Sequence, residues 1–432
     1  MLGLMMVSSL YGNANAQSLA ASSAESQFTQ PARDIMSLFQ NQADAATLFT
    51  PAFIAAVPAE QLAMVIKSLR DQFGEPIAVD AIRPMDVRSA SVDIRFDKAV
   101  VSFTIGVLDG KISGLFVTGS RTADDSFAKI IAELGKISLT SGLVLQEITP
   151  QGPVPIARHN SDARFAIASV FKLYVLAEID RAVRAGERRW DDVLALTHKS
   201  HPSGIAHDWP YNAPITLQTL ATLMISISDN SATDTLIAAI GQRKLGAIVR
   251  ASGHATAQDL LPMLTTQQVT GLKMPANAAL RDRFLAASER DQPDILAEAS
   301  QTLSMPNLDL SVYTGGPNQI DTVQWFASPA DIARLLARLE READPVTRAI
   351  LRINPGIAPV NAARWDYLGY KGGSEPGVMA MSFLARSKAG KTYILSAVAN
   401  NDALEIDQPR FTQLMTRMLD LAAQRDASAI RP

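Results

Sequence analysis

The sequence predicts an α+β protein with two unequal domains. The first part of the chain contains two runs with helical periodicity, followed by three runs in which apolar and polar residues alternate. The rest contains one strand-like run, a long helical stretch, two further strand-like runs and a final helical run. Helices and strands that are segregated along a chain in this way are typical of α+β folds.

The first domain is predicted over residues 17–120. Helices are expected at about Ala32–Gln42 and at Ala59–Phe73, where a Gly and a Pro follow as stop signals. Strands are expected at 91–96, 99–105 and 111–117. The Asp109-Gly110 turn before the last of these indicates an antiparallel hairpin. The polar stretch Thr118–Asp125 is expected to be a linker.

The second domain is predicted over residues 121–432. A strand is expected at Gly142–Thr149, and amphipathic helices from about 169 to about 350. Strands are then expected at Val378–Arg386 and Tyr393–Asn400, joined by a turn, and a last helix at about 408–423. Strands from both ends of this domain can share one antiparallel sheet, with helices packed against it.

Composition excludes several classes of protein. The chain has 432 residues and no cysteine, so disulfide scaffolds, thiolate-ligated zinc sites and cysteine nucleophiles are impossible. The net charge is −3, and acidic residues exceed basic ones only within 17–120. A dedicated nucleic-acid-binding protein would carry a strong basic excess. We therefore expect a small-molecule substrate and no nucleic acid.

The N-terminus resembles an export signal. Residues 1–16 combine a short apolar run with Ala14-Asn15-Ala16, a small-x-small cleavage pattern, but lack a basic start. No later run reaches the roughly 18 apolar residues that a membrane span needs. We expect a signal peptide over 1–16, no membrane span, and a periplasmic or secreted protein.

The first motif with chemical potential is Ser169-Val-Phe-Lys172. On a helix, residues three apart share a face, so Lys172 could take the proton of the Ser169 hydroxyl if burial lowers the pKa of its amine. The pattern alone is weak, because Ser126-Phe-Ala-Lys129 matches it too. Ser126 begins a predicted helix, so we expect it to be a cap or surface residue.

Two further motifs follow. Ser228-Asp229-Asn230 separates two apolar helical runs, and it is either an N-cap or a loop that presents a hydroxyl and an amide to a cleft. Lys371-Gly372-Gly373-Ser374 ends a strand-like run. Its glycines would let a backbone or ligand approach closely, and its lysine could bind a carboxylate; an ordinary strand end with a turn is the alternative.

In this order, the three motifs resemble the signature of the serine β-lactamase and penicillin-recognising superfamily. The resemblance covers about 121–432, and it implies an α/β/α sandwich. The local sequences are more similar to one branch, which includes the β-lactamase-like protein of clavulanic-acid gene clusters. In that branch the small N-terminal domain is similar to steroid isomerases and polyketide cyclases. Residues 17–120 contain no Tyr or His, so we expect binding, gating or docking there rather than isomerase catalysis.

The resemblance also implies a role for each site residue. Ser169 would be the acylated nucleophile, Lys172 its base, and Ser228 the proton relay to the leaving group. Lys371 would bind a carboxylate and polarise Ser228. The remaining substrate-binding group comprises Asn230, Gly373, and Ser374, whose backbone N–H would join that of Ser169 in an oxyanion hole.

Two departures from the family pattern change the expected chemistry. Gly372 replaces the usual threonine, so carboxylate recognition would be weakened or would pass to Ser374. The glutamate that class A enzymes use for deacylation would fall at Leu264, and no Glu lies between residues 231 and 288. Part of the helical stretch, roughly 285–330, is expected to be an insertion that reshapes the cleft.

We therefore expect an exported serine hydrolase that forms a Ser169 acyl-enzyme with a lactam, ester or amide and releases β-lactams poorly. Two alternatives stay open: a non-catalytic penicillin-binding or sensor-type protein, and a true β-lactamase with another deacylation base. No cofactor is expected.

One weaker cluster surrounds Trp209. His198, His201 and His207 lie close in sequence, but Pro and Gly residues between them favour a surface loop over a metal site. Trp209 could contact substrate or simply pack against the protein.

Overall fold

A computed structural model describes residues 27–121 and 125–429. The chain divides into two compact units, 1–125 and 126–432. The predicted signal peptide lies outside the described residues. In the described ranges, no helix combines the length and apolar character that crossing a bilayer requires.

Within residues 27–121, the first unit packs four helices against one face of an antiparallel sheet. Residues 27–39 are helical and are followed by α2 (Ala45–Leu48), α3 (Pro51–Ala56) and α4 (Ala59–Phe73). The sheet has the order β1-β2-β3-β4, with bounds Pro76–Pro84, Ser89–Phe96, Val100–Leu108 and Lys111–Arg121. Phe39 packs on Phe96 and Phe103, with ring centroids 6.0 and 5.3 Å away. The predicted helix Ala59–Phe73 is confirmed.

Two expectations for this unit need correction. Strand β1 was not predicted, because Pro76 and Pro84 bound it and its exposed face carries apolar residues that mask the alternation. The linker does not begin at Thr118. Residues up to Arg121 pair with β3, so they belong to strand β4. Residues 122–124, the middle of the predicted linker, lie outside the described residues.

The second unit is built on a five-stranded antiparallel sheet of order β11-β12-β13-β5-β6. The strands are β5 (Thr140–Thr149), β6 (Gly152–His159), β11 (Trp365–Glu375), β12 (Val378–Ser387) and β13 (Thr392–Asn400). Strand β5 pairs with β13, with Thr140 opposite Asn400. The predicted α+β fold, with strands from both ends of the domain in one sheet, is confirmed. Edge strand β6 was missed, because its two prolines obscure the strand pattern.

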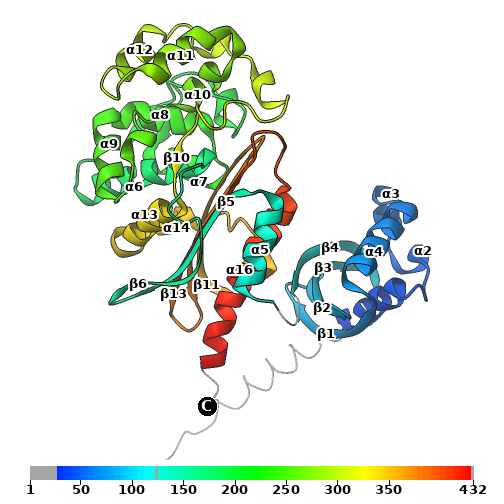
Figure 1. Cartoon of the computed structure of the whole chain (residues 1–432). Coiled ribbons are helices and arrows are strands. Elements are labelled where there is room, and N and C mark those ends of the chain that lie inside the picture. Colours follow the sequence, from blue (N-terminus) through cyan, green and yellow to red (C-terminus); the bar gives the residue numbers. More distant parts are fainter. Residues whose placement is uncertain (1–26, 122–124, 430–432) are drawn as a thin grey trace, which may run out of the picture. The chain divides into compact units, whose positions relative to one another are not determined.

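Helices cover both faces of this sheet (Figure 1). One face packs against α5 (Phe127–Ile137) and the C-terminal helix α16 (Gln408–Ala429), around Phe383 and Tyr393. The other face, which carries Ile394 and Val398, packs against the helical stretch that begins with α6 (Lys172–Arg184). The second unit is therefore a three-layer α/β/α sandwich.

The helical stretch has the following elements in chain order: η1 (Ala168–Phe171), α7 (Leu217–Ser226), α8 (Asn230–Ile240), α9 (Gln242–Ala251), α10 (Thr266–Lys273), α11 (Ala278–Ala286), α12 (Gln292–Glu298), η6 (Leu310–Tyr313), α13 (Pro329–Glu342), α14 (Pro345–Leu351) and α15 (Pro359–Ala362). Short strands β7 (Phe165–Ala166) and β10 (Phe326–Ala327) pair with each other, as do β8 (Val193–Ala195) and β9 (Pro214–Thr216).

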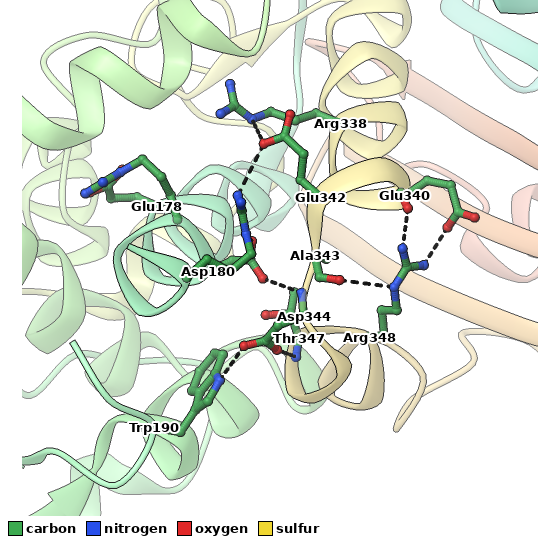
Figure 2. A network of polar contacts seen from close by, with 12 residues as sticks. Glu178, Asp180, Trp190, Arg338, Glu340, Glu342, Ala343, Asp344, Thr347 and Arg348 are labelled. Atoms are coloured by element: carbon green, nitrogen blue, oxygen red, sulfur yellow. Dashed lines mark hydrogen bonds and ion pairs between the residues drawn. The ribbon is translucent and has the colours of Figure 1, made fainter. Parts of the chain in front are cut away.

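A polar network fixes the C-terminal half of α6 (Figure 2). The Asp180 carboxylate accepts from the backbone N–H of Asp344 at 2.9 Å, and the Asp344 carboxylate accepts from Trp190 Nε1 at 2.8 Å. Arg184 joins Asp180 to Glu342, with N···O distances of 2.7 and 3.2 Å. The network ties α6 to α13 and α14. Because a helix is stiff, this anchorage also sets the position of Lys172 at the other end of α6.

Candidate active site

One cavity collects residues from all three sequence motifs. Its volume is about 440 Å³, and its walls include Ser169 from the first motif, Ser228 and Asn230 from the second, and Lys371 and Ser374 from the third. These segments are far apart in sequence and meet because β11 runs alongside η1, while the α7–α8 loop faces both.

Ser169 occupies the turn that leads into α6. Its neighbours Val170 and Phe171 are fully buried, and the Phe171 ring stacks on Trp325 with centroids 3.9 Å apart. Ser169 itself is only partly buried and faces the cavity. The Ser169 hydroxyl forms no hydrogen bond with any residue in the described parts of the chain. Ala168 on the other side is buried as well, so packing holds the backbone on both sides of a serine whose hydroxyl stays open to a ligand.

Gly373 makes room for this turn. A Cβ at position 373 would lie 2.5 Å from the Ile167 carbonyl oxygen and 2.6 Å from the Ser169 backbone nitrogen. Such separations are well below van der Waals contact, so only glycine lets β11 approach the turn this closely. Gly373 thus determines the distance between the strand and Ser169.

Lys172 is completely buried at the start of α6. Its Nζ donates to the Ser228 carbonyl oxygen at 2.6 Å and to Asn230 Oδ1 at 2.7 Å, and lies 3.1 Å from Ser228 Oγ. Burial lowers the pKa of this amine to about 7, although the carboxylates of Asp234 and Asp229 act in the opposite direction. A large fraction of Lys172 is therefore neutral near pH 7.

Ser228 lies between two lysines. Its Oγ is 3.1 Å from Lys172 Nζ and 3.0 Å from Lys371 Nζ. Its backbone has a φ of 59°, a region that side-chain-bearing residues seldom adopt and that recurs at functional sites. Asp229 supports this conformation, since its carboxylate caps α8 at Ala232 N and accepts from Ile205 N and Ala206 N. Both interpretations of the Ser-Asp-Asn motif therefore hold: Asp229 is the cap, and its neighbours face the cavity.

Lys371, which lines the cavity, is also buried. Besides contacting Ser228, its Nζ donates to the Gly372 carbonyl oxygen at 2.5 Å. Burial lowers the pKa of Lys371 well below that of a free lysine, and the nearby Lys172 lowers it further. Two ammonium groups are costly this close together in a buried site, so the pair binds fewer than two protons near neutral pH.

This arrangement can move protons between hydroxyl groups. A neutral lysine has two N–H donors and one lone pair. The Ser228 carbonyl and Asn230 Oδ1 can take both donors of Lys172, which leaves its lone pair for a hydroxyl proton. Ser228 can then accept a hydrogen bond from one lysine while donating to a substrate or to the other.

Several lining residues were not singled out from the sequence: Tyr313, Trp325, Tyr370 and Glu375. Glu375 is the sole carboxylate among the residues that line the cavity, and it forms an ion pair with Lys273, a buried residue at the end of α10. The sequence feature that could have identified Glu375 is its position one residue past the third motif. Tyr313 and Trp325 come from the segment 285–330, which was expected to reshape the cleft.

Leu264 takes no part in the cavity wall. Its side chain is buried, and its carbonyl oxygen accepts a hydrogen bond from Trp325 Nε1 at 3.0 Å. The nearest cavity residue along this segment is Thr266, whose hydroxyl and backbone N–H donate to the buried Asp234. No acid from residues 259–266 reaches the cavity, since Asp259 pairs with Arg164 at 3.5 Å instead.

Trp209 lies away from the cavity wall. Its ring packs on the main hydrophobic core, and its carbonyl oxygen accepts from Lys199 Nζ. The structure thus favours packing over substrate contact. The rings of His201 and His207 lie 4.0 Å apart, and His198 Nδ1 is 2.9 Å from the Thr197 hydroxyl. Within the described ranges, no three His, Asp or Glu side chains are grouped as metal ligands would be.

Comparison with known proteins gives one family and a set of similar structures. No curated protein matches the chain. Among solved structures, a beta-lactamase from Sphaerobacter thermophilus DSM 20745 is 22% identical, covering 70% of this chain and 98% of its own, with a TM-score of 0.49. One from Chitinophaga pinensis DSM 2588 is 14% identical, with 69% and 99% covered and a TM-score of 0.47. A structure of PBP-A is 16% identical, with 69% and 96% covered and a TM-score of 0.44.

The family match is to the beta-lactamase enzyme family, and it spans residues 125–352, more than half of the chain. It includes the first two motifs, while the third lies beyond its end. The chain therefore belongs to the beta-lactamase enzyme family.

Proposed function

We propose that the protein is a serine hydrolase that works through an acyl-enzyme on Ser169. The observation that carries the proposal is the contact of Ser228 Oγ with two buried lysines, at 3.1 and 3.0 Å, in the cavity that Ser169 lines. Buried amines with lowered pKa values at a concave site can accept and donate protons at neutral pH, as general acid–base catalysis requires.

In the proposed acylation step, Ser169 Oγ bonds to the substrate carbonyl carbon and Lys172 Nζ takes the hydroxyl proton. The bond to the leaving group then breaks as Ser228 Oγ gives its proton to that group. Ser228 recovers a proton from the lysine pair, so the enzyme differs from its starting state only by the acyl group on Ser169. Backbone N–H groups of Ser169 and Ser374 would stabilise the oxyanion.

Deacylation requires a water molecule and a base. Because Leu264 is buried and apolar, the position expected to supply the family's glutamate provides none. We propose that β-lactam adducts persist, because the amine of the opened ring stays attached to the acyl group, and that esters, whose alcohol departs on acylation, turn over with Lys172 as base in both steps. A non-catalytic penicillin-binding or sensor-type role would instead leave every adduct unhydrolysed.

One observation favours a second candidate, a true β-lactamase with Glu375 as base. Glu375 is the cavity's single carboxylate among the lining residues, and it falls on the same face of β11 as Lys371 and Gly373. In that case Glu375 would take a proton from water as the water oxygen bonds to the acyl carbon. The proton would then pass to Ser169 Oγ. The ion pair with Lys273 opposes this role, because it stabilises the carboxylate and lowers its proton affinity.

Mass spectrometry after incubation with a penicillin, a cephalosporin and an activated ester tests these proposals. We expect a covalent adduct on the wild type and none on Ser169→Ala; an undiminished adduct on Ser169→Ala would overturn the acyl-enzyme. Glu375→Gln should leave the lifetime of a penicillin adduct unchanged. A lifetime lengthened about 100-fold or more would assign the base to Glu375. Asp259→Asn, which changes an acid outside the cavity, is the matched control.

The location and the first unit are proposed on sequence grounds. We propose export to the periplasm or medium, which N-terminal sequencing of the protein from the culture medium and from separated cell fractions tests. A mature chain that begins at Gln17 in an extracytoplasmic fraction is expected. We further propose that the first unit, in the manner of an isomerase or cyclase-like domain without catalytic groups, serves in binding or docking. Deleting it should leave the acylation chemistry of Ser169 intact.

A further inference from the structure

The space beside Gly372 is filled by a neighbouring side chain. A Cβ built at position 372 would overlap the hydroxyl oxygen of Tyr370 and lie 2.7 Å from its Cζ. Tyr370 and Gly372 are two apart on β11, so their side-chain positions fall on one face of the strand. The tyrosine hydroxyl therefore occupies the place that a side chain at position 372 would take.

The Tyr370 ring is fixed by its surroundings. It packs on Phe383 of β12 with centroids 4.9 Å apart, and the loop that follows α14 crosses it at Gly356. A Cβ at Gly356 would overlap the ring, and Gly356 adopts a φ of 67°. Asn354 holds this loop, since its amide donates to the Ser226 carbonyl at 3.0 Å and its Oδ1 accepts from Gly356 N at 2.9 Å. The glycines at 356 and 372 and the Phe383 ring thus fix the position of the Tyr370 phenol.

The hydroxyl end of this fixed ring lies beside Gly372, and both residues line the cavity. Tyr370 is a lining residue, and its hydroxyl forms no hydrogen bond with any residue of 27–121 or 125–429. Burial raises the pKa of the phenol to about 12, so it remains a neutral O–H donor at physiological pH. Ser374 lies on the same face of β11, is exposed, and likewise forms no hydrogen bond within those ranges. Two free hydroxyls therefore flank the bare backbone of Gly372.

We propose that the Tyr370 hydroxyl is a carboxylate-binding group, which donates a hydrogen bond to a substrate carboxylate held between it and Ser374. The proposal rests on the proposed function, because it assigns a specificity residue to the same cavity. The lysine pair binds fewer than two protons, and Lys371 Nζ already donates to Ser228 Oγ and the Gly372 carbonyl. A carboxylate therefore needs further donors, and neutral hydroxyls supply them without adding charge to the lysine pair.

Benzylpenicillin and its methyl ester form the test pair, since they differ only in whether the carboxylate is free. The wild type should be acylated faster by the free acid. Tyr370→Phe keeps the ring and removes only the hydroxyl. We expect it to lower the second-order acylation rate constant of the acid about 10-fold or more, and that of the methyl ester less than about 2-fold. Equal losses on both probes, or no loss, would refute carboxylate binding by Tyr370.

A rescue variant separates the hydroxyl from the packing of the ring. Tyr370→Ala should lose the preference for the acid, and Tyr370→Ala combined with Gly372→Thr should regain part of it, because the removed ring leaves room for a hydroxyl at 372. Tyr367→Phe is the control. This tyrosine lies on the same strand, and its hydroxyl donates to the Arg348 carbonyl at 3.0 Å outside the cavity, so its loss should leave the preference unchanged.

A binding measurement distinguishes failure of this inference from failure of the proposed function. Calorimetry of Ser169→Ala with both probes requires no acylation. If the wild type forms no adduct, the acyl-enzyme proposal fails, yet an acid preference that Tyr370→Phe abolishes in the Ser169→Ala background still supports the carboxylate site. If adducts form and the binding preference is indifferent to Tyr370→Phe, the carboxylate site fails and the acyl-enzyme stands.

Discussion

The two Ser-x-x-Lys sequences of this chain have the same spacing and different environments. Ser126 is the N-cap of α5, where its hydroxyl accepts from Lys129 N at 3.2 Å, and Ser126 is exposed while Lys129 is partly exposed. Ser169 lies in a tight turn over a cavity, and Lys172 is fully buried between Ser228 and Asn230. The predicted capping role of Ser126 is confirmed. The spacing places two side chains on one face; burial gives one of the pairs its chemistry.

The largest expected difference is between the two serines. Ser169→Ala should abolish covalent labelling by an activated ester, because the attacking oxygen is gone. Ser126→Ala should label at the wild-type rate and lose about 1 kcal/mol of unfolding free energy, the usual cost of a lost N-cap. Intact-protein mass spectrometry and thermal melts measure the two effects. Labelling that survives in Ser169→Ala would contradict the comparison.

The next largest difference is expected between the lysines of the two Ser-x-x-Lys sequences. Lys172→Ala should slow acylation about 10²- to 10⁴-fold, the range associated with loss of a general base. Lys129→Ala should change the acylation rate less than about 2-fold, because surface substitutions away from the site have small effects. Stopped-flow or quenched labelling gives the rates, and circular dichroism confirms that both variants fold. Similar rates for the two variants would mean that Lys172 is not the base.

A comparison of two glycines tests whether the acylation rate depends on the close packing of β11 against the Ser169 turn. Gly373→Ala places a Cβ 2.5 Å from the Ile167 carbonyl and must displace either β11 or the Ser169 turn. Because a displacement of about 1 Å can cost about 10²-fold in rate, we expect a loss of that order. Gly135→Ala in α5 meets no atom within 4 Å and should stabilise the helix by up to about 1 kcal/mol without affecting the rate. A fully active Gly373→Ala would show that the close approach is dispensable.

The pH dependence is the mildest test. Since the Lys172 amine has a pKa of about 7, its neutral form increases as pH rises. The acylation rate should therefore rise about tenfold per pH unit well below 7 and level off above it. Buffers from pH 5 to 9 and an ester that does not titrate in this range give the profile. A rate that is flat or falls with rising pH would exclude a neutral Lys172 as base.

Much of the fold could be predicted because its patterns are local. Helix α4 and strands β12 and β13 carry clear periodicity and ordinary stop signals, so sequence alone comes close to their bounds. Strands β1 and β6 were missed because their prolines resemble turn signals, although sheet edges tolerate proline. The end of β4 was taken for a linker because its residues are polar, and only pairing with β3 reveals it as a strand.

Some residues of the cavity could likewise be predicted from the sequence, and others could not. Ser169, Ser228 and Lys371 could be proposed because each belongs to a short motif. Tyr313, Trp325 and Tyr370 have no motif, and their approach to the cavity depends on packing between distant segments. For Trp209 the sequence left substrate contact and packing open as alternatives, and in the structure its ring packs on the core.

The sequence by itself determined the kinds of groups available: no thiol, a serine nucleophile candidate, three motifs in order, no acid at position 264, and a glycine at 372. The tertiary structure alone decided what those groups can do. Lys172 is available as a neutral base near pH 7 only because buried side chains remove water from its amine, and Ser228 joins two lysines that are 199 residues apart only because strand and helix meet. Desolvation and distance depend on the whole packed domain, so no local pattern encodes them; the hydroxyl that Tyr370 places beside Gly372 arises in the same way.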